Sequence, residues 1–284
     1  MKIAAFGQTG QVGTEMARRV PDGVTLEMIG RDRADFMLPD VLYGIVRGLD
    51  ADVIVNAAAY TQVDRAETDA DIARLVNATA VRSLAAACQA AGKPLVHVST
   101  DYVFDGSGET PRKPGDPTGP LGVYGQTKLA GEEAIREIAP AHAILRTSWV
   151  FSAHGGNFVK TMLRLGATRD RLTIVADQVG GPTPAAAIAD ALFAVGRAMA
   201  DGHQGGTYHF SGAPEVSWAD FAREIFRQAG LGTQVADIPT SDYPTPAARP
   251  LNSRLDCTGL AHDFGIPRPD WRGGLAEVLK ELGA

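Results

Sequence analysis

Short apolar segments alternate with segments of helical periodicity through the first half of the chain, and this alternation constrains the fold most. The apolar segments contain few polar residues, which is typical of strands buried on both faces of a sheet. They cover residues 3–6, 26–29, 52–56, 95–98 and 143–145. The helical segments cover residues 12–20, 41–49, 72–91 and 124–138. This order predicts an α/β fold in which helices cover both faces of a parallel sheet.

The loop after the first predicted strand is rich in glycine. It reads Gly7-Gln8-Thr9-Gly10-Gln11-Val12-Gly13 and leads directly into the first predicted helix. Glycines at such a turn let the backbone approach a pyrophosphate, and the helix N-terminus attracts the anion. The spacing is G-x-x-G-x-x-G, slightly wider than the common G-x-G-x-x-G. We therefore predict a Rossmann-type, doubly wound sheet with a dinucleotide contacting Gly7, Gly10, Gln11, Val12 and Gly13.

The end of the second predicted strand is expected to meet the adenosine part of the cofactor. It reads Gly30-Arg31-Asp32. An arginine suits a 2′-phosphate, so Arg31 favours NADP(H), whereas Asp32 leaves NAD(H) open, as does a purely surface role for Arg31. Asp35 and Phe36 follow as candidates for binding the adenine amine and stacking on the ring. A buried core phenylalanine is the alternative interpretation of Phe36.

The ends of the third and fourth predicted strands supply further candidates, because ligands bind beyond the carboxyl ends of parallel strands. Small residues after the third strand let a cofactor lie against the backbone. The candidates there are Ala57, Ala58, Ala59, Tyr60 and Thr61. Val98 and Ser99 are the cofactor candidates of the fourth strand, and Thr100 places a hydroxyl at its tip, within reach of a substrate carbonyl. The alternative for Thr100 is a hydroxyl that only caps a turn.

Tyr124 and Lys128 are four residues apart in a predicted helix and therefore share one face. A lysine ammonium beside a phenol favours the phenolate, so we expect the pKa of Tyr124 to fall below its usual value of ~10. A tyrosine of this kind can act as a general acid in hydride transfer. The alternative is a surface tyrosine next to a solvated lysine.

The second half of the chain is less regular. Helical segments are predicted at residues 157–165, 185–199 and 218–229, and short strands at 172–175 and 207–210. We predict an NADP(H)-binding Rossmann domain over residues 1–148 and a smaller mixed α/β lobe mainly over 149–284, with an interleaved boundary. The lobe is expected to bind substrate in a cleft between the two parts.

Composition excludes several classes of protein. The chain has 27 Lys and Arg against 33 Asp and Glu, a net charge of −6, which argues against a general nucleic-acid binder. No apolar run reaches about 18 residues, so we expect no membrane span. Cys88 and Cys257 offer no disulfide framework. The first residues lack the features of a signal peptide, and we expect a cytoplasmic protein.

These segments together resemble the extended short-chain dehydrogenase/reductase superfamily, and within it the dTDP-4-dehydrorhamnose reductase family. The motifs that carry the resemblance span nearly the whole chain. They lie at residues 6–13, 53–67, 99–104, 120–132, 146–151, 157–163, 177–183 and 243–255. The resemblance implies that NADPH reduces the C4 ketone of dTDP-4-dehydro-6-deoxy-L-mannose to give dTDP-L-rhamnose, the last step of dTDP-L-rhamnose biosynthesis, for cell-surface polysaccharides.

The resemblance also implies roles for individual residues. Tyr124 would donate a proton to the C4 oxygen, Lys128 would bind the nicotinamide ribose, and Thr100 would polarise the carbonyl. Arg249 and Arg254 are implied candidates for the diphosphate, although a surface ion pair is the alternative for either. The implied sugar contacts are Val63, Asp64, Asp101, Tyr102 and Trp149.

Some members of the family form dimers around Mg²⁺ held by carboxylates. Glu15 matches one ligand, but Ala186 stands where another carboxylate is expected, and Glu15 with Asp190 makes a poor site for a hard cation. We therefore expect no metal, and a monomer or a homodimer without that bridge. Two other functions stay open: a nucleotide-sugar epimerase or dehydratase, and a non-catalytic NADP-binding subunit of the methionine adenosyltransferase type.

Overall fold

Six parallel strands form the central sheet, which confirms the predicted parallel α/β fold. The structure is a computed structural model that describes residues 1–284. The strands lie in the order β10-β5-β4-β3-β1-β2, and every neighbouring pair is parallel. They are β1 (Lys2–Phe6), β2 (Thr25–Ile29), β3 (Val53–Asn56), β4 (Leu95–Thr100), β5 (His142–Thr147) and β10 (Gly205–His209).

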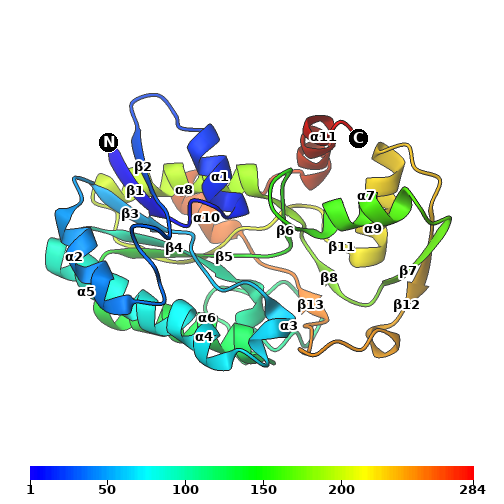
Figure 1. The fold of residues 1–284 in the computed structure, drawn as a ribbon, viewed down its shortest axis with the longest axis horizontal. Helices are drawn as coiled ribbons and strands as arrows, with labels where there is room; N and C mark the ends of the chain where they lie inside the picture. Colours follow the sequence, from blue (N-terminus) through cyan, green and yellow to red (C-terminus); the bar gives the residue numbers. More distant parts are fainter.

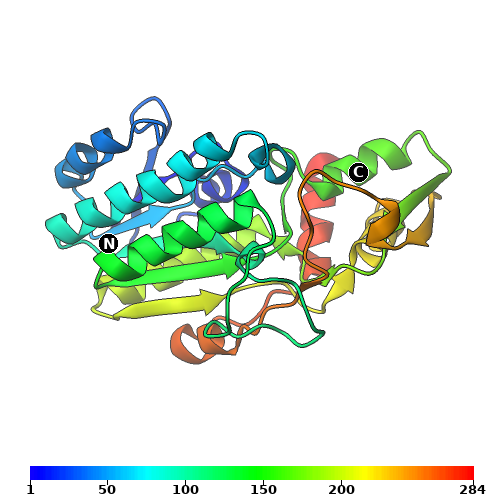
Figure 2. The same ribbon diagram turned by 90° about the horizontal axis from the view of Figure 1, so that it is seen from below.

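Helices cover both faces of this sheet (Figure 1). One face carries α1 (Gln11–Arg18), α8 (Ala185–Ala200) and α10 (Thr258–Phe264). The other carries α2 (Pro39–Gly48), α5 (Ala80–Ala91) and α6 (Val123–Ile138), and Figure 2 shows α5 and α6 lying side by side across it. Successive strand residues point to opposite faces, so Ile3 and Ala5 enter one core while Ala4 and Phe6 enter the other. Burial on both faces explains the continuous apolar strands.

The helix predicted over residues 72–91 is divided in the structure. It consists of α4 (Ala70–Arg74), a π-helical segment over Leu75–Thr79, and α5. The π-helical segment carries Asn77, whose buried side chain bonds both backbone groups of Tyr60 and the Thr127 hydroxyl. Such bulges are frequent at functional sites. Here the bulge ties the chain after β3 to α6, the helix that carries Tyr124.

The smaller lobe is built from short strands and three helices. The helices are α7 (Phe158–Gly166), α9 (Trp218–Gln228) and α11 (Trp271–Leu282). β7 (Arg171–Val175) pairs with β12 (Gln234–Ile238), and β6 (Val150–Phe151) with β9 (Thr183–Pro184). β8 (Val179–Gly180) lies between β11 (Val216–Ser217) and β13 (Asn252–Ser253). The aromatic side chains of Phe151, Phe221, Phe226 and Trp271 dominate the core of the lobe.

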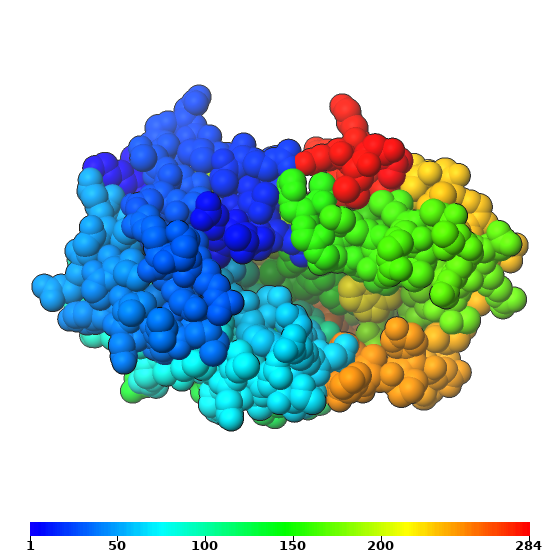
Figure 3. Space-filling model, viewed as in Figure 1, coloured from blue at the N-terminus to red at the C-terminus, as the bar shows by residue number.

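The chain crosses between the two parts more than once. β10 and α8 come from the second half but complete the central sheet and one of its helical layers. The arrows of the central strands point toward the smaller lobe in Figure 2. Figure 3 shows a hollow between the blue and cyan surface of the first half and the green and orange surface of the lobe. The carboxyl ends of the strands therefore face a hollow between the two parts. No helix in the structure is both long and apolar enough to span a membrane.

Candidate active site

The glycine loop packs so tightly that two of its glycines cannot carry a side chain. Gly7 has a φ of 101°, and a Cβ on it would lie 2.7 Å from the backbone of Ala57. A Cβ on Gly13 would lie 2.1 Å from the carbonyl oxygen of Gly7. No side chain caps α1, which begins after Gly10, so its first N–H groups are available to an anion. The loop fits the pyrophosphate of a dinucleotide. Gln11 uses its side chain elsewhere, as acceptor for Ser152 and Asn157 of the smaller lobe.

The residues after β2 form a small polar edge. Arg31 is exposed, and its Nε donates to the Asp35 carboxylate at 3.2 Å, which also accepts from the backbone of Met37. The guanidinium is therefore at the surface where a 2′-phosphate is expected. Phe36 is only 6% exposed and packs edge-on against Phe6 in the core. The prediction of an open stacking platform at Phe36 is wrong in this structure, because the ring fills the core between β1 and α2.

The predicted cofactor contacts after β3 and in β4 differ in the exposure and the hydrogen bonding of their side chains. Ala57, Ala58 and Ala59 are half-buried after β3, and Thr61 is exposed. Tyr60 donates its hydroxyl to Asp69. Val98 is half-buried on one face of β4, whereas the Ser99 hydroxyl is buried on the other face and donates to Glu132. Ser99 can therefore meet a cofactor only through its backbone, because its side chain points into the opposite helical layer.

Thr100 and Tyr124 meet at the carboxyl end of β4. Thr100 is the last residue of β4, and Tyr124 lies in the first turn of α6. Burial raises the pKa of Tyr124 to about 12; the Thr100 hydroxyl opposes this rise and the neighbouring Asp101 adds to it. The expected lowering of the Tyr124 pKa is therefore wrong here. The phenol is protonated at neutral pH and so is a proton donor, and Tyr102 packs edge-on against its ring at 5.5 Å.

Asp101 lies directly behind this pair. Its Oδ1 accepts from the Thr100 hydroxyl at 3.1 Å, while Oδ2 is buried without a hydrogen-bond partner of normal geometry. Burial raises the pKa of Asp101 to about 6, against the effect of the Ser253 and Thr100 hydroxyls. The Ser253 hydroxyl is near enough to lower the pKa of Asp101 but forms no hydrogen bond with Oδ2, so this buried oxygen still needs a donor. A sugar hydroxyl is the kind of group that would satisfy it.

Lys128 is buried one helical turn after Tyr124 but is turned toward the sheet. Its Nζ donates to the carbonyl of Val98 at 2.8 Å and lies 3.1 Å from His97 Nε2. Burial lowers the pKa of Lys128 to about 8, although the nearby Glu132 carboxylate opposes the shift. The cation that was expected to lower the Tyr124 pKa is thus engaged by β4. Sequence reasoning missed His97, whose position within an apolar strand was its only signal.

Trp149 lies directly before β6 at the start of the smaller lobe and is held in an unusual conformation. Its φ is 48°, the only non-glycine residue with a positive φ. Its indole stacks on Trp218 with centroids 3.6 Å apart, and Trp218 Nε1 donates to Gln178. Backbone strain of about 1–3 kcal/mol is typical of binding and active sites. Trp218 and Gln178 were missed as supports of Trp149, because stacking across the lobe leaves no signal in sequence spacing.

The two arginines proposed for the diphosphate have different surroundings. Arg249 forms an ion pair with Asp64 at 2.7 Å, which links α3 (Val63–Ala66) to the proline-rich segment before β13. Arg254 has no acidic partner and donates only to the side chain of Asn252. Val63 is half-buried at the start of α3. Arg254 is therefore the more available of the two for an anionic group.

The carboxylates considered for Mg²⁺ are engaged otherwise. Arg19 forms two hydrogen bonds with Asp190, and Ala186 provides no ligand. Glu15 lies near His154 and Glu281, with possible ligand atoms within 4.8 Å of one another. Arg18, however, contacts both His154 and Glu281. A histidine and a guanidinium do not suit a hard cation, so these residues do not fit a bridging Mg²⁺.

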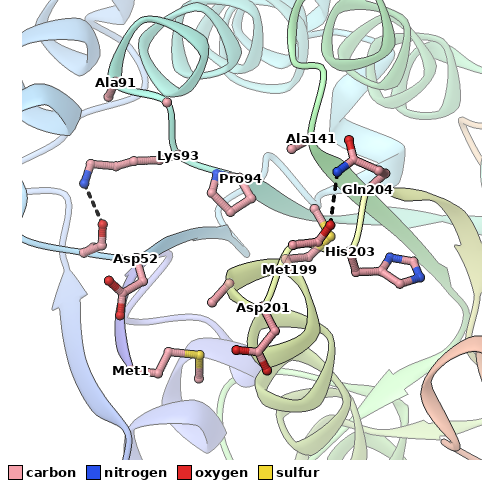
Figure 4. A pocket seen from close by; sticks show the side chains of 14 residues that line it. Met1, Asp52, Ala91, Lys93, Pro94, Ala141, Met199, Asp201, His203 and Gln204 are labelled. Atoms are coloured by element: carbon pink, nitrogen blue, oxygen red, sulfur yellow. Dashed lines mark hydrogen bonds between the residues drawn. The ribbon is translucent and has the colours of Figure 1, made fainter.

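A second hollow lies at the opposite end of the sheet (Figure 4). It has a volume of about 680 Å³ and is lined by residues that precede the strands, among them Met1, Asp52, Pro94 and Gln204. Lys93 donates to a backbone carbonyl there. The hollow is far from Tyr124 along the strands, and ligands of such sheets bind at the other edge. We assign it no part in the chemistry.

The position of Thr100, Tyr124 and Lys128 beyond a glycine cradle defines the class of protein. A doubly wound sheet with this arrangement at its carboxyl edge is that of the extended short-chain dehydrogenases/reductases.

The chain belongs to the dTDP-4-dehydrorhamnose reductase family, whose family model, described as RmlD substrate binding domain, matches residues 1–284. It is 43% identical to the dTDP-4-dehydrorhamnose reductase of Salmonella typhimurium, covering 99% of this chain and 98% of that protein. A dTDP-4-dehydrorhamnose reductase structure from Clostridium acetobutylicum has a TM-score of 0.94 at 35% identity, with both chains fully covered. The Bacillus anthracis structure in complex with NADP has a TM-score of 0.92 at 32% identity, covering 99% of each chain.

Proposed function

We propose that the protein uses NADPH to reduce the C4 ketone of dTDP-4-dehydro-β-L-rhamnose, giving dTDP-L-rhamnose as the last step of that pathway. The observation that carries this proposal is a protonated Tyr124 beside Thr100 at the carboxyl edge of the sheet. Identity of 43% over nearly the full length of a named reductase favours this function over an epimerase, a dehydratase or a non-catalytic subunit.

The residues of the chain divide the work of this reaction. NADPH, when bound, supplies the hydride. Thr100 and Tyr124 hold the carbonyl oxygen between two hydroxyls, and Tyr124 gives its proton to that oxygen as negative charge develops there. Asp101 Oδ2 accepts from a sugar hydroxyl, and Trp149 provides an apolar face for the sugar ring.

The binding of the two phosphate-bearing groups follows from charge and backbone geometry. The glycine loop and the free N–H groups of α1 receive the pyrophosphate of the cofactor. Arg254, which lacks an acidic partner, binds the diphosphate of the nucleotide sugar. Arg249 instead keeps α3 and the proline-rich segment together through Asp64.

The test is the absorbance of NADPH on mixing the protein with dTDP-4-dehydro-β-L-rhamnose. We expect stoichiometric oxidation of NADPH and formation of dTDP-L-rhamnose. The UDP- and GDP-linked analogues are compared in parallel to measure the preference for the thymine nucleotide. An epimerase or dehydratase would convert the sugar without net loss of NADPH, and a non-catalytic subunit would bind NADPH without turnover. Either result would contradict the proposal.

The preference for NADPH is proposed to depend on Arg31. The Arg31→Ala variant is expected to raise the KM for NADPH by about tenfold, because it removes a charged hydrogen bond to the 2′-phosphate. The KM for NADH should change little. Arg33→Ala is the matched control, since Arg33 is also exposed and also pairs with a carboxylate, that of Glu27 on β2, whereas Arg31 pairs with Asp35. Equal KM values for NADPH in the variant and the parent would remove Arg31 from cofactor selection.

A further inference from the structure

A chain of buried polar groups runs from the end of β3 to Lys128. The backbone N–H of Ala58 donates to Asn56 Oδ1 at 3.0 Å, and Asn56 Nδ2 lies 3.0 Å from His97 Nδ1. His97 Nε2 then lies 3.1 Å from Lys128 Nζ. Asn56 and His97 occupy paired positions of the neighbouring strands β3 and β4, so their side chains are held together by the sheet register. All three side chains are almost completely buried.

The donors and acceptors along this row of hydrogen-bonded groups restrict the protonation state of Lys128. A backbone N–H can only donate, so Asn56 must present its oxygen to Ala58 and its NH₂ to His97. His97 Nδ1 is then an acceptor. Burial, with the nearby Lys128, holds the pKa of His97 well below its usual 6.5, so the ring is neutral and its single proton is on Nε2. That N–H points at Lys128, which must accept it.

An ammonium at Lys128 cannot accept a hydrogen bond. It would face the His97 N–H donor to donor. Reversing the ring tautomer moves the conflict to the Asn56 amide, and reversing the amide as well moves it to Ala58. An uncharged amine removes the conflict: its lone pair accepts from His97 and one of its N–H groups donates to Val98. Every group of the chain then has a partner, as buried polar groups require.

We propose that His97 is a positioning residue that stabilises the uncharged amine of Lys128 relative to the ammonium, with Asn56 fixing the His97 tautomer. The consequence for catalysis rests on the proposed function. Lys128 can assist Tyr124 as a cation only at pH values below its lowered pKa, where it carries its proton at the expense of this hydrogen bond. His97 thereby sets the pH above which activity falls, in agreement with a Lys128 pKa of about 8.

Other charged groups face Lys128 from the elements around it. Glu132 on α6 favours the ammonium, but it is paired with Arg146 of β5 and Arg136 of its own helix. Tyr124, on the same helix, is neutral with a pKa of about 12. Asp101, beyond the tip of β4, adjoins Tyr124. His97 is the only one of these groups in hydrogen-bonding contact with Lys128 Nζ.

The first test is the tautomer of His97, measured by long-range ¹⁵N–¹H NMR on the full-length wild-type protein. We expect the Nε2–H tautomer without titration near neutral pH. His209 is an internal reference of opposite geometry, because its Nδ1 faces the carbonyl of Arg112 at 2.9 Å and its Nε2 faces Arg146. It should show the Nδ1–H tautomer. An Nδ1–H tautomer or a charged ring at His97 would overturn the proposal, whether or not any variant folds.

The second test measures the pKa of Lys128 by ¹³Cε-lysine NMR without substrate, with the signal assigned from a Lys128→Arg sample. His97→Gln replaces the donor with a carbonyl that can accept from an ammonium, so the Lys128 pKa should rise by about one unit or more. The alkaline limb of kcat/KM should move by the same amount. His209→Gln, the matched control, changes a buried histidine without contacting Lys128 and should shift neither.

Two results of the second test would contradict the proposal. One is a wild-type Lys128 that titrates near the ordinary 10.5. The other is a His97→Gln variant, folded by circular dichroism, with an unchanged Lys128 pKa. Because the NMR titration uses the free enzyme, it gives an answer even if the proposed substrate is not turned over. Failure of the proposed function and failure of the His97 assignment are therefore distinguishable.

Discussion

Replacing Tyr124 with phenylalanine is expected to lower kcat by about 10²–10⁴-fold, the usual contribution of a positioned general acid. The variant removes one oxygen and leaves the ring in place against Tyr102, so the fold and the hollow should be preserved. The effect should fall on kcat more than on KM, because the proton is transferred only as the C4 oxygen gains charge. Steady-state kinetics with NADPH and the dTDP-linked ketone measure both parameters.

The dissociation constant for NADPH provides the control for this experiment. It should change little, since the phosphate cradle lies on α1 and not on α6. Tyr43→Phe makes the same chemical change at an exposed tyrosine of α2 and should keep full activity. Near-normal kcat in Tyr124→Phe would show that another group supplies the proton.

Replacing Glu132 with glutamine is expected to lower the free energy of unfolding by about 3–5 kcal/mol, as when one partner of a buried ion pair is removed. Glu132 is fully buried and accepts from Arg146 at 2.9 and 2.6 Å, and also from Ser99. Arg146 is only 2% exposed, so the variant leaves its charge unpaired in the core. Urea or guanidinium unfolding followed by circular dichroism measures the loss.

The pH dependence of stability provides a second measurement on Glu132. Although burial opposes it, the pairing with Arg146 holds the pKa of Glu132 below its usual 4.5. The carboxylate therefore adds stability above pH 4.5, and this contribution is lost as the pH falls through the lower value of the folded state. Glu132→Gln should lack that part of the acid transition.

The control for this variant is Glu137→Gln. Glu137 lies on the same helix but pairs with Arg82 at the surface, where both side chains are more than half exposed. The free energy of unfolding of this control should change by less than about 1 kcal/mol. An equal decrease in the free energy of unfolding of the two variants would show that the buried ion pair stabilises the protein no more than the surface pair does.

The arrangement of the site could be predicted only in part. The glycine loop, Thr100, Tyr124 and Lys128 were identified because their signals are local: a turn before a helix, the tip of a strand, and a four-residue spacing. The direction of the Tyr124 pKa shift was wrong, because spacing places Lys128 on the same face without showing what its ammonium contacts. For Phe36 the structure favours the alternative of a buried core residue, which the sequence could not distinguish from an adenine contact because burial of the ring depends on Phe6 and α2.

The parallel sheet could be predicted from the sequence alone, and so could the candidates for the phosphate cradle and the proton donor, since each depends on residues close together in the chain. The contact between Lys128 and His97, the ion pair of Arg249 with Asp64 and the stacking of Trp149 on Trp218 became visible only in the folded chain. The reason is physical. A pKa or a side-chain direction depends on burial and on polar partners 31 to 185 residues away, such as His97 for Lys128 and Asp64 for Arg249.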